Sequence, residues 1–326
     1  MSMNPDSARR PKTEHNRDLD IKPDIAIASA VQRMQQVIVS ACAQELWHKP
    51  TEENNAKASS DEHKLKIHTE NYSELVTAVD LRLSKIILTA ARQSLPQSYS
   101  EEELPTKPST AKFLWQIDPL DGTDEFASGL TDFCGVSAAL LKQLDNGSYK
   151  SIAGIIYIPA RDLLLSADLT NSTLLIKEKG ADISDRTKTA CKSRSEADRS
   201  VLRGYQRRID SNQEVESYYK TVAQGLGVPV EVIQCGGAAH GFAALALGEI
   251  NLFCFNYDYS KEWDVSAAQP IIESMGGFVC DLAGNEIVYN SGEKDHFNRQ
   301  GFIASICFSK AMVLPTHTDA LLLKRL

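Results

Sequence analysis

The segment best suited to chemistry is the run DPLDGT, which begins at Asp118 and directly follows an apolar stretch. Two carboxylates three residues apart at the end of a strand, Asp118 and Asp121, can converge on one point, and Mg²⁺ prefers carboxylate oxygens. Pro119 fixes one backbone angle between them, and Gly122 permits a sharp turn. If a helix begins at Thr123, its free N–H groups create an anion site beside this cation site. The structural alternative is a simple turn, because Asp, Pro and Gly all favour turns.

Three further segments carry carboxylates that such a site requires. Glu101 begins a triple glutamate run, with Glu102 as the alternative ligand, although such a run also suits a solvated loop. Asp264 follows a tryptophan at the start of an expected helix, where an aspartate also serves as an N-cap. Asp80 lies three residues after Thr77 in a pattern typical of a capping box, and it remains able to orient a hydroxyl group.

Taken in chain order, these segments resemble the inositol monophosphatase superfamily, the lithium-sensitive, magnesium-dependent phosphatases. The pattern is Asp, then Glu-Glu, then DPLDGT, then Trp-Asp followed by small residues, and it spans residues 24–308. The resemblance implies an α/β fold, a layered α-β-α-β-α sandwich of the inositol monophosphatase and fructose-1,6-bisphosphatase type. It also implies hydrolysis of a small phosphorylated metabolite by a water that metal ions activate, with two or three Mg²⁺ as cofactors.

The resemblance assigns roles to individual residues. Thr123, assisted by Asp80, is expected to orient the attacking water, and Glu101 is expected to take part in catalysis. The amides of Gly122 and Thr123 are expected to hold phosphate. The implied metal ligands are Glu101, Asp118, Asp121, Asp264 and the main-chain carbonyl of Leu120.

The substrate is less clearly indicated. The branch that acts on 3'(2'),5'-bisphosphate nucleotides often reads DGTKEF, and this chain has DGTDEF, with Asp124 in place of the lysine. An acidic side chain there would repel a second phosphate, so Asp124→Lys is expected to lower KM for a nucleotide. Expected substrate contacts are Asp124, Gly237, Ala238 and His240, of which His240 also suits an ordinary helix position.

A 3'(2'),5'-bisphosphate nucleotidase is therefore the favoured interpretation. An inositol-1-monophosphatase or a related sugar-phosphate phosphatase is the alternative, although Tyr257 occupies the position where those enzymes often place a glutamate. A metal- and phosphate-binding protein with little catalysis is the alternative from a different class.

The elements that must position these residues follow from apolar periodicity and turn signals. Helices are expected at 24–49 and 80–95, with a polar surface loop between them at 51–72. An antiparallel meander is expected next, with strands at 113–117, 133–141, 152–158 and 163–167. Strands expected at 201–205, 230–234 and 251–255 then alternate with helices expected at 238–247 and 264–275, which implies a partly parallel sheet. The expected domains are 23–195, which carries most metal ligands, and 196–326, which contributes Asp264.

Composition sets limits on partners and location. A net charge of -8 argues against binding of nucleic-acid polymers, which depends on basic patches. The seven cysteines form no C-x-x-C pair and suit reduced residues of a cytoplasmic protein. No apolar run is long enough to span a membrane, and the polar segment 1–22 is expected to be a disordered tail. The resemblance implies a possible homodimer.

Overall fold

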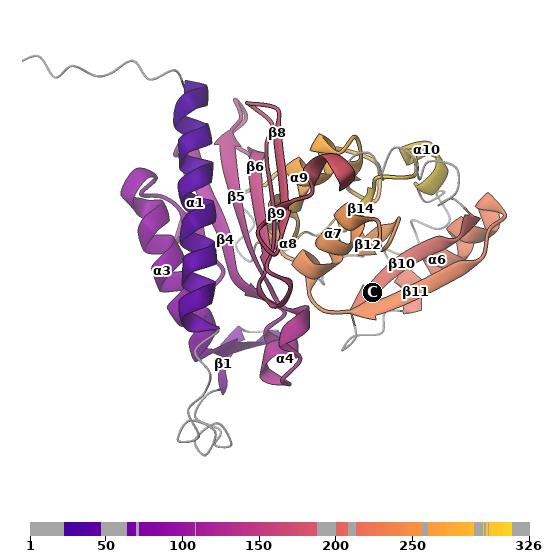
Figure 1. Cartoon of the computed structure of the whole chain (residues 1–326), viewed down its shortest axis with the longest axis horizontal. Helices are drawn as coiled ribbons and strands as arrows, with labels where there is room; N and C mark the ends of the chain where they lie inside the picture. Colours follow the sequence, from indigo (N-terminus) through magenta and orange to yellow (C-terminus); the bar gives the residue numbers. More distant parts are fainter. Residues whose placement is uncertain are drawn as a thin grey trace, which may run out of the picture.

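The computed structural model describes residues 23–46, 64–69, 72–107, 109–187, 200–207, 213–255, 260–289, 296, 298 and 300–314. The expected tail at 1–22 and Tyr257 lie outside the described residues. Helices and sheets alternate in layers across the molecule, from α1 and α3 through the main sheet and α7 to the strands near α6 (Figure 1). Within the part of the chain that is described, no helix is long and apolar enough to cross a membrane.

The main sheet has seven strands in the order β3-β4-β5-β6-β7-β8-β9. Each neighbouring pair from β4 to β9 is antiparallel, which confirms the meander, and the short β3 runs parallel to β4. The strands are Tyr99–Ser100, Phe113–Asp121, Gly135–Gln143, Tyr149–Ile158, Leu163–Asp168, Thr173–Glu178 and Ala181–Asp182.

Two helices cover one face of this sheet: α1 (Pro23–Glu45) and α3 (Ala78–Ser94) (Figure 1). Their apolar stripes meet the sheet in one buried cluster that includes Ile38, Leu83 and Trp115. The capping box predicted at Thr77 is present, because the Thr77 side chain accepts from the first turn of α3 and the Asp80 carboxylate accepts the Thr77 N–H at 2.9 Å.

The opposite face is covered by α7 (Ala238–Leu247), α8 (Glu262–Ser266) and α9 (Ala268–Ser274). The single helix expected at 264–275 is therefore wrong: it divides at Ala267. Pro270 has no N–H to bond the Ser266 carbonyl, and the hydroxyl of Ser151 in β6 donates to that carbonyl at 2.7 Å instead. A Cβ on Gly154 would lie 1.8 Å from the Ala267 oxygen, so only glycine lets this turn approach the sheet.

The remaining strands form a second β layer. β10 (Leu202–Arg207) and β11 (Val230–Cys235) are parallel, and a parallel bridge from Gly204 to Leu252 joins them to the antiparallel set β12-β14-β13. These three strands are Phe253–Phe255, Phe302–Ser305 and Phe278–Cys280, and the helices are α6 (Gln213–Leu226) and α10 (Lys310–Val313). The layers together make the α-β-α-β-α sandwich.

The polar loop expected over 51–72 is wrong at its carboxyl end, where the chain forms strands. Lys64–Thr69 (β1) and Tyr72–Thr77 (β2) form an antiparallel hairpin, with Leu65 opposite Val76. The sequence KLKIHT alternates polar and apolar residues, which is the period of a strand, and the charge of its lysines masked that signal.

Candidate metal centre

An irregularity in β4 places Asp118 and Asp121 on the same side of the sheet. Residues three apart in a regular strand point to opposite faces. Here Asp118 pairs with Ser137 and Asp121 with Gly135, so three steps on β4 match two steps on β5. Pro119 explains the break, since it has no N–H for the ladder.

Asp121 is held by the amino end of α7. Its Oδ1 accepts the Ala238 N–H at 3.0 Å, and its Oδ2 accepts the Ala239 N–H at 2.8 Å. A Cβ on Gly237 would lie 2.2 Å from Asp121 Oδ2, so glycine is required for this contact. The expected substrate residues Gly237 and Ala238 therefore contact a carboxylate of the cluster.

Strand β3 brings Glu101 next to Asp118. Ser100 pairs with Ile117, and the Glu101 N–H donates to the Ile117 carbonyl at 3.0 Å. The third glutamate of the run, Glu103, instead forms an ion pair with Arg92 on the surface. Of the three glutamates, Glu101 is thus the one that directly follows the strand beside Asp118.

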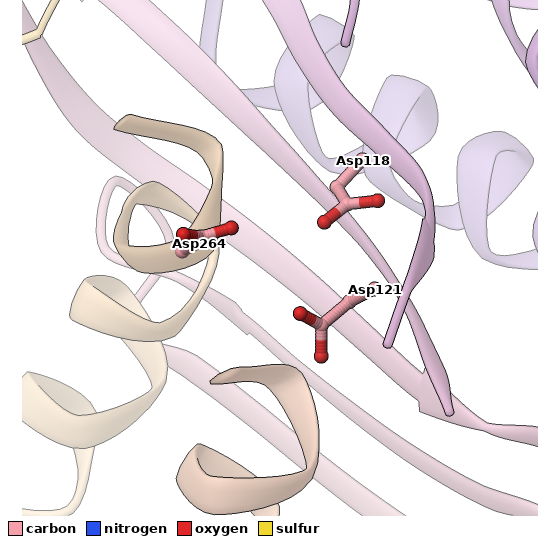
Figure 2. A group of neighbouring side chains, drawn as sticks. All are labelled: Asp118, Asp121 and Asp264. Carbon is pink, nitrogen blue, oxygen red and sulfur yellow. The ribbon is translucent and has the colours of Figure 1, made fainter. Parts of the chain in front are cut away.

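Asp264 comes from α8 and faces the two other aspartates across the site (Figure 2). The Lys261 N–H donates to its Oδ2 at 2.7 Å. Helix α8 begins at Glu262 with Lys261 as its N-cap, so Asp264 is the third helical residue and accepts from the cap residue; the alternative that Asp264 itself serves as the N-cap is wrong. The hydroxyl of Ser137 donates to the Trp263 carbonyl at 3.1 Å, which fixes this turn against β5.

Carboxylate oxygens of Asp118, Asp121 and Asp264 all lie within 4.8 Å of one another. Burial raises the pKa of Asp118 well above its usual range, and the charges of Glu101, Asp121 and Asp264 raise it further. Burial likewise raises the pKa of Asp121 to about 6, against an opposing effect of Arg207. Burial and the charge of Asp121 raise the pKa of Asp264 to about 7. The cluster concentrates negative charge that requires compensation.

This donor set fits magnesium. All three side chains offer hard oxygen ligands, and neither sulfur nor imidazole belongs to the group. Like charges held this closely and buried repel one another strongly, so a divalent cation would stabilise the arrangement. The site thus fits the cofactor that the sequence predicts.

The predicted water-orienting pair is in contact. The Thr123 hydroxyl lies 2.8 Å from Asp80 Oδ1 and 3.0 Å from the Leu120 carbonyl oxygen. Gly122 has φ +88°, a left-handed conformation that favours glycine, and helix α4 (Thr123–Ala127) begins directly after it. The sharp turn and the helix start expected from DPLDGT are both present.

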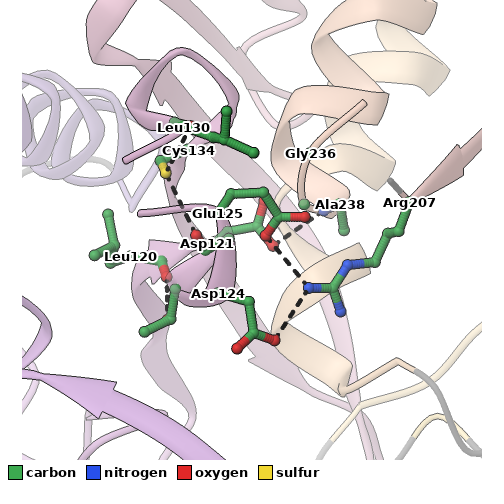
Figure 3. Close-up of polar contacts among 12 residues, drawn as sticks. Leu120, Asp121, Asp124, Glu125, Leu130, Cys134, Arg207, Gly236 and Ala238 are labelled. Atoms are coloured by element: carbon green, nitrogen blue, oxygen red, sulfur yellow. Dashed lines mark hydrogen bonds and ion pairs between the residues drawn. The ribbon is translucent and has the colours of Figure 1, made fainter. Parts of the chain in front are cut away.

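Sequence reasoning missed Arg207, at the end of β10. Its guanidinium lies 3.8 Å from Asp124 and 3.4 Å from Glu125 (Figure 3). Glu125 is fully buried, whereas the side chain of Asp124 is 49 % exposed. An available signal was the basic pair after the predicted strand 201–205, because ligands often bind at the carboxyl ends of strands.

Two histidines have contrasting surroundings. His240 is buried, packs edge-on against Phe133, and its Nδ1 has no hydrogen-bond partner among the described residues. Burial lowers its pKa, and the charges that act on it are those of Glu249 and Arg161. His296, which sequence reasoning missed, contacts Glu262 near Asp264: its Nδ1 lies 3.2 Å from Glu262 Oε2.

The layered α/β fold and the buried carboxylate cluster together suit a metal-dependent phosphatase. The family model for the inositol monophosphatase family matches residues 23–312, and the chain belongs to this family. Family members hydrolyse phosphomonoesters and are generally magnesium-dependent, so the chain is a phosphoric monoester hydrolase. The family recognised from the sequence is confirmed.

Curated relatives carry several different names. The putative Nus factor SuhB of Neisseria meningitidis serogroup B is 25% identical over 241 residues, 73% of this chain and 85% of the relative. The mouse 3'(2'),5'-bisphosphate nucleotidase 1 is 28% identical over 219 residues, 66% of this chain and 62% of the relative. Tomato inositol monophosphatase 1 is 27% identical over 220 residues, 65% and 74% of the two chains.

Solved structures share the fold. Inositol monophosphatase II of Staphylococcus aureus aligns with a TM-score of 0.62 at 16% identity, covering 93% of this chain and 100% of the other. CysQ of Bacteroides thetaiotaomicron, a bacterial member of the inositol monophosphatase family, aligns with a TM-score of 0.58 at 20% identity, covering 88% of this chain and 97% of the other. These likenesses confirm the predicted sandwich.

Proposed function

We propose that the chain is a magnesium-dependent 3'(2'),5'-bisphosphate nucleotidase with its metal ions at the carboxylate cluster. The observation that carries the metal assignment is the convergence of three aspartates within 4.8 Å. Two or three Mg²⁺ would be held by Asp118, Asp121, Asp264, Glu101 and the Leu120 carbonyl. When bound, magnesium supplies Lewis acidity and neutralises charge on the phosphoryl oxygens.

The chain's own groups orient the reactants. Thr123 donates its proton to Asp80 or Leu120, and its oxygen lone pairs are then available to accept a hydrogen bond from the attacking water. The N–H groups of Gly122 and Thr123, at the turn where α4 begins, bind the phosphate. Asp264 keeps its carboxylate fixed through the Lys261 N–H, so it is preorganised toward the cluster.

The substrate assignment is supported by sequence and by one relative. Glu125-Phe126, Gly236-Gly237 and Lys261 agree with the nucleotidase branch. A mouse relative named as a bisphosphate nucleotidase is 28% identical over 219 residues, although a tomato inositol monophosphatase is nearly as similar. The test compares kcat/KM for adenosine 3',5'-bisphosphate and for inositol 1-phosphate. Preference for the nucleotide supports the proposal, and preference for the inositol ester reverses it.

Two further outcomes separate the alternatives. Absence of magnesium-dependent phosphate release from every ester tested would favour a binding protein with little catalysis. Lithium at millimolar order is expected to inhibit, and potassium at the same ionic strength is not. Equal response to both salts would remove lithium sensitivity from the proposal.

Location and assembly are also proposed. We propose a cytoplasmic protein that acts on a small phosphorylated metabolite, without a nucleic-acid polymer or a membrane as partner. Among the described residues, four buried cysteines are free thiols, which suits a reducing compartment: Cys42, Cys134, Cys254 and Cys280. A homodimer is the proposed assembly, and light scattering coupled to gel filtration would measure the mass, against 35.9 kDa for one chain.

A further inference from the structure

Arg207 reaches from the end of β10 to Asp124 and Glu125 in α4 (Figure 3). Burial raises the pKa of both Asp121 and Asp264, and the positive charge of Arg207 opposes burial by lowering the pKa of both groups. The guanidinium is therefore electrostatically close to the metal centre although it is not part of it. Only 22 % of its side chain is exposed.

The two carboxylates beside Arg207 differ in how easily they can be replaced. Glu125 is fully buried, at 3.4 Å, and separating it from a cation would be costly. Asp124 is 49 % exposed and 3.8 Å away, longer than the 2.7–2.9 Å usual for a charge-assisted hydrogen bond. Water can solvate Asp124 readily, so this contact is weak and exchangeable.

The position of Asp124 indicates which ligand group could displace its carboxylate from Arg207. It directly follows Thr123, whose N–H belongs to the proposed phosphate-binding turn, and its side chain points toward Arg207 (Figure 3). A substrate whose reacting phosphate lies at that turn would extend past this pair. A guanidinium offers a planar fork of N–H donors that matches phosphate geometry.

We infer that Arg207 is a specificity-determining residue that binds a second phosphate of the substrate by displacing Asp124, while Glu125 keeps the guanidinium in place. The substrate class is thus a compact metabolite with two phosphate groups. The inference rests on the phosphatase activity but not on the nucleotide, since any bisphosphate of suitable spacing satisfies it. Asp124, which from sequence alone should only repel such a group, becomes the residue that holds Arg207 ready.

The test is a ratio of kcat/KM for two esters that differ only in the second phosphate: adenosine 3',5'-bisphosphate and adenosine 3'-phosphate. Arg207→Gln should lower this ratio by about 10- to 100-fold, the effect of one lost hydrogen bond between charged groups. Arg203→Gln is the matched control, because Arg203 lies on the same strand and pairs with Glu231 instead. The control should leave the ratio unchanged.

Two more variants protect the test against misfolding and check the role of Asp124. Glu125→Gln/Arg207→Gln removes both charges of the buried pair, and the ratio should fall as in the single variant. Asp124→Asn frees Arg207 from its competitor and should lower KM for the bisphosphate by about 1.5- to 5-fold, the strength of an exposed ion pair.

The outcomes decide between the explanations. A ratio that is unchanged in both Arg207 variants would overturn the inference. If kcat/KM falls equally for both esters, the ratio is also unchanged, and Arg207 would then serve the reacting phosphate. If the wild-type protein hydrolyses neither adenosine ester, the nucleotidase proposal fails by itself. The same variants are then compared on fructose 1,6-bisphosphate and fructose 1-phosphate, and a wild-type ratio near one on this pair would overturn the inference as well.

Discussion

The hydroxyl of Thr123 lies 2.8 Å from Oδ1 of Asp80, although the two residues are 43 positions apart in the chain. The same hydroxyl lies 3.0 Å from the Leu120 carbonyl and has one proton to donate. A carboxylate is the stronger acceptor, so the proton goes to Asp80 when the Leu120 carbonyl is engaged by a cation. The threonine oxygen then has lone pairs for a water molecule.

Thr123→Val should test this pair, because it removes the hydroxyl at nearly constant volume. We expect kcat to fall by about 10²–10⁴-fold, as for loss of a group that positions a proton transfer, with little change in the magnesium concentration for half-maximal rate. Thr123→Ser keeps the hydroxyl and should retain much of the rate. A variant in which magnesium dependence shifts while the saturated rate survives would instead make Thr123 part of the metal site.

Gly237→Ala is expected to damage the metal site without unfolding the protein. The added Cβ would lie 2.2 Å from Asp121 Oδ2 and would force this carboxylate out of the cluster. Magnesium affinity, measured by calorimetry, should fall at least tenfold. Gly225→Ala in α6 is the control, because no heavy atom lies within 4 Å of its new Cβ. Equal magnesium affinity in the two variants would contradict the placement of Asp121.

The features that could be predicted from the sequence are those marked by residues close together in the chain. The run DPLDGT and the Trp-Asp pair identified Asp118, Asp121 and Asp264, because residue type and order alone mark them. The bulge that unites Asp118 and Asp121 follows from Pro119 only once the pairing with β5 is known. Local periodicity predicted the meander and α7 in the same way.

What could not be predicted depends on long-range packing. The basic pair after the strand at 201–205 does not show which partners Arg207 meets, and Arg207 acquires a role because β10 ends opposite α4. His296 acquires its role because its chain segment pairs with residues 260–262, where the Glu262 N–H donates to the His296 carbonyl at 2.9 Å. Arginine and histidine are common on surfaces, and only the tertiary fold distinguishes these two.

His296 should support the turn that carries Asp264. Its imidazole and carbonyl both contact Glu262, and its φ of +54° is a strained backbone value for most residues. His296→Ala should lower the free energy of unfolding by about 1–3 kcal/mol, since it leaves buried Glu262 short of a partner, and should weaken magnesium binding. His296→Asn should recover part of both, because asparagine tolerates this conformation and its amide can donate. Identical losses in the two variants would remove this role.

The stability of the metal-free protein should fall as pH rises from 5 to 8. Burial raises the pKa of Asp121 to about 6 and that of Asp264 to about 7, so the folded state binds more protons than the unfolded state in this window. Each pKa unit corresponds to about 1.4 kcal/mol. Thermal unfolding in chelator should show the melting temperature of the wild type dropping relative to Asp264→Asn, and magnesium at pH 8 should reverse the drop. A difference that stays constant with pH would contradict the clustered charges.

The most direct test of the central claim is magnesium-dependent phosphate release by the wild type and by Asp118→Asn. Asp118 is buried, and its Oδ1 accepts the Leu120 N–H at 3.0 Å in the wild type. The change removes one charge, and the amide oxygen of asparagine can still accept this hydrogen bond. We expect a folded variant with an unchanged circular dichroism spectrum, magnesium binding weakened at least about tenfold and turnover reduced by at least about 10²-fold at saturating magnesium. Turnover equal to that of the wild type at saturating magnesium would contradict the assignment of the carboxylate cluster as the catalytic metal centre.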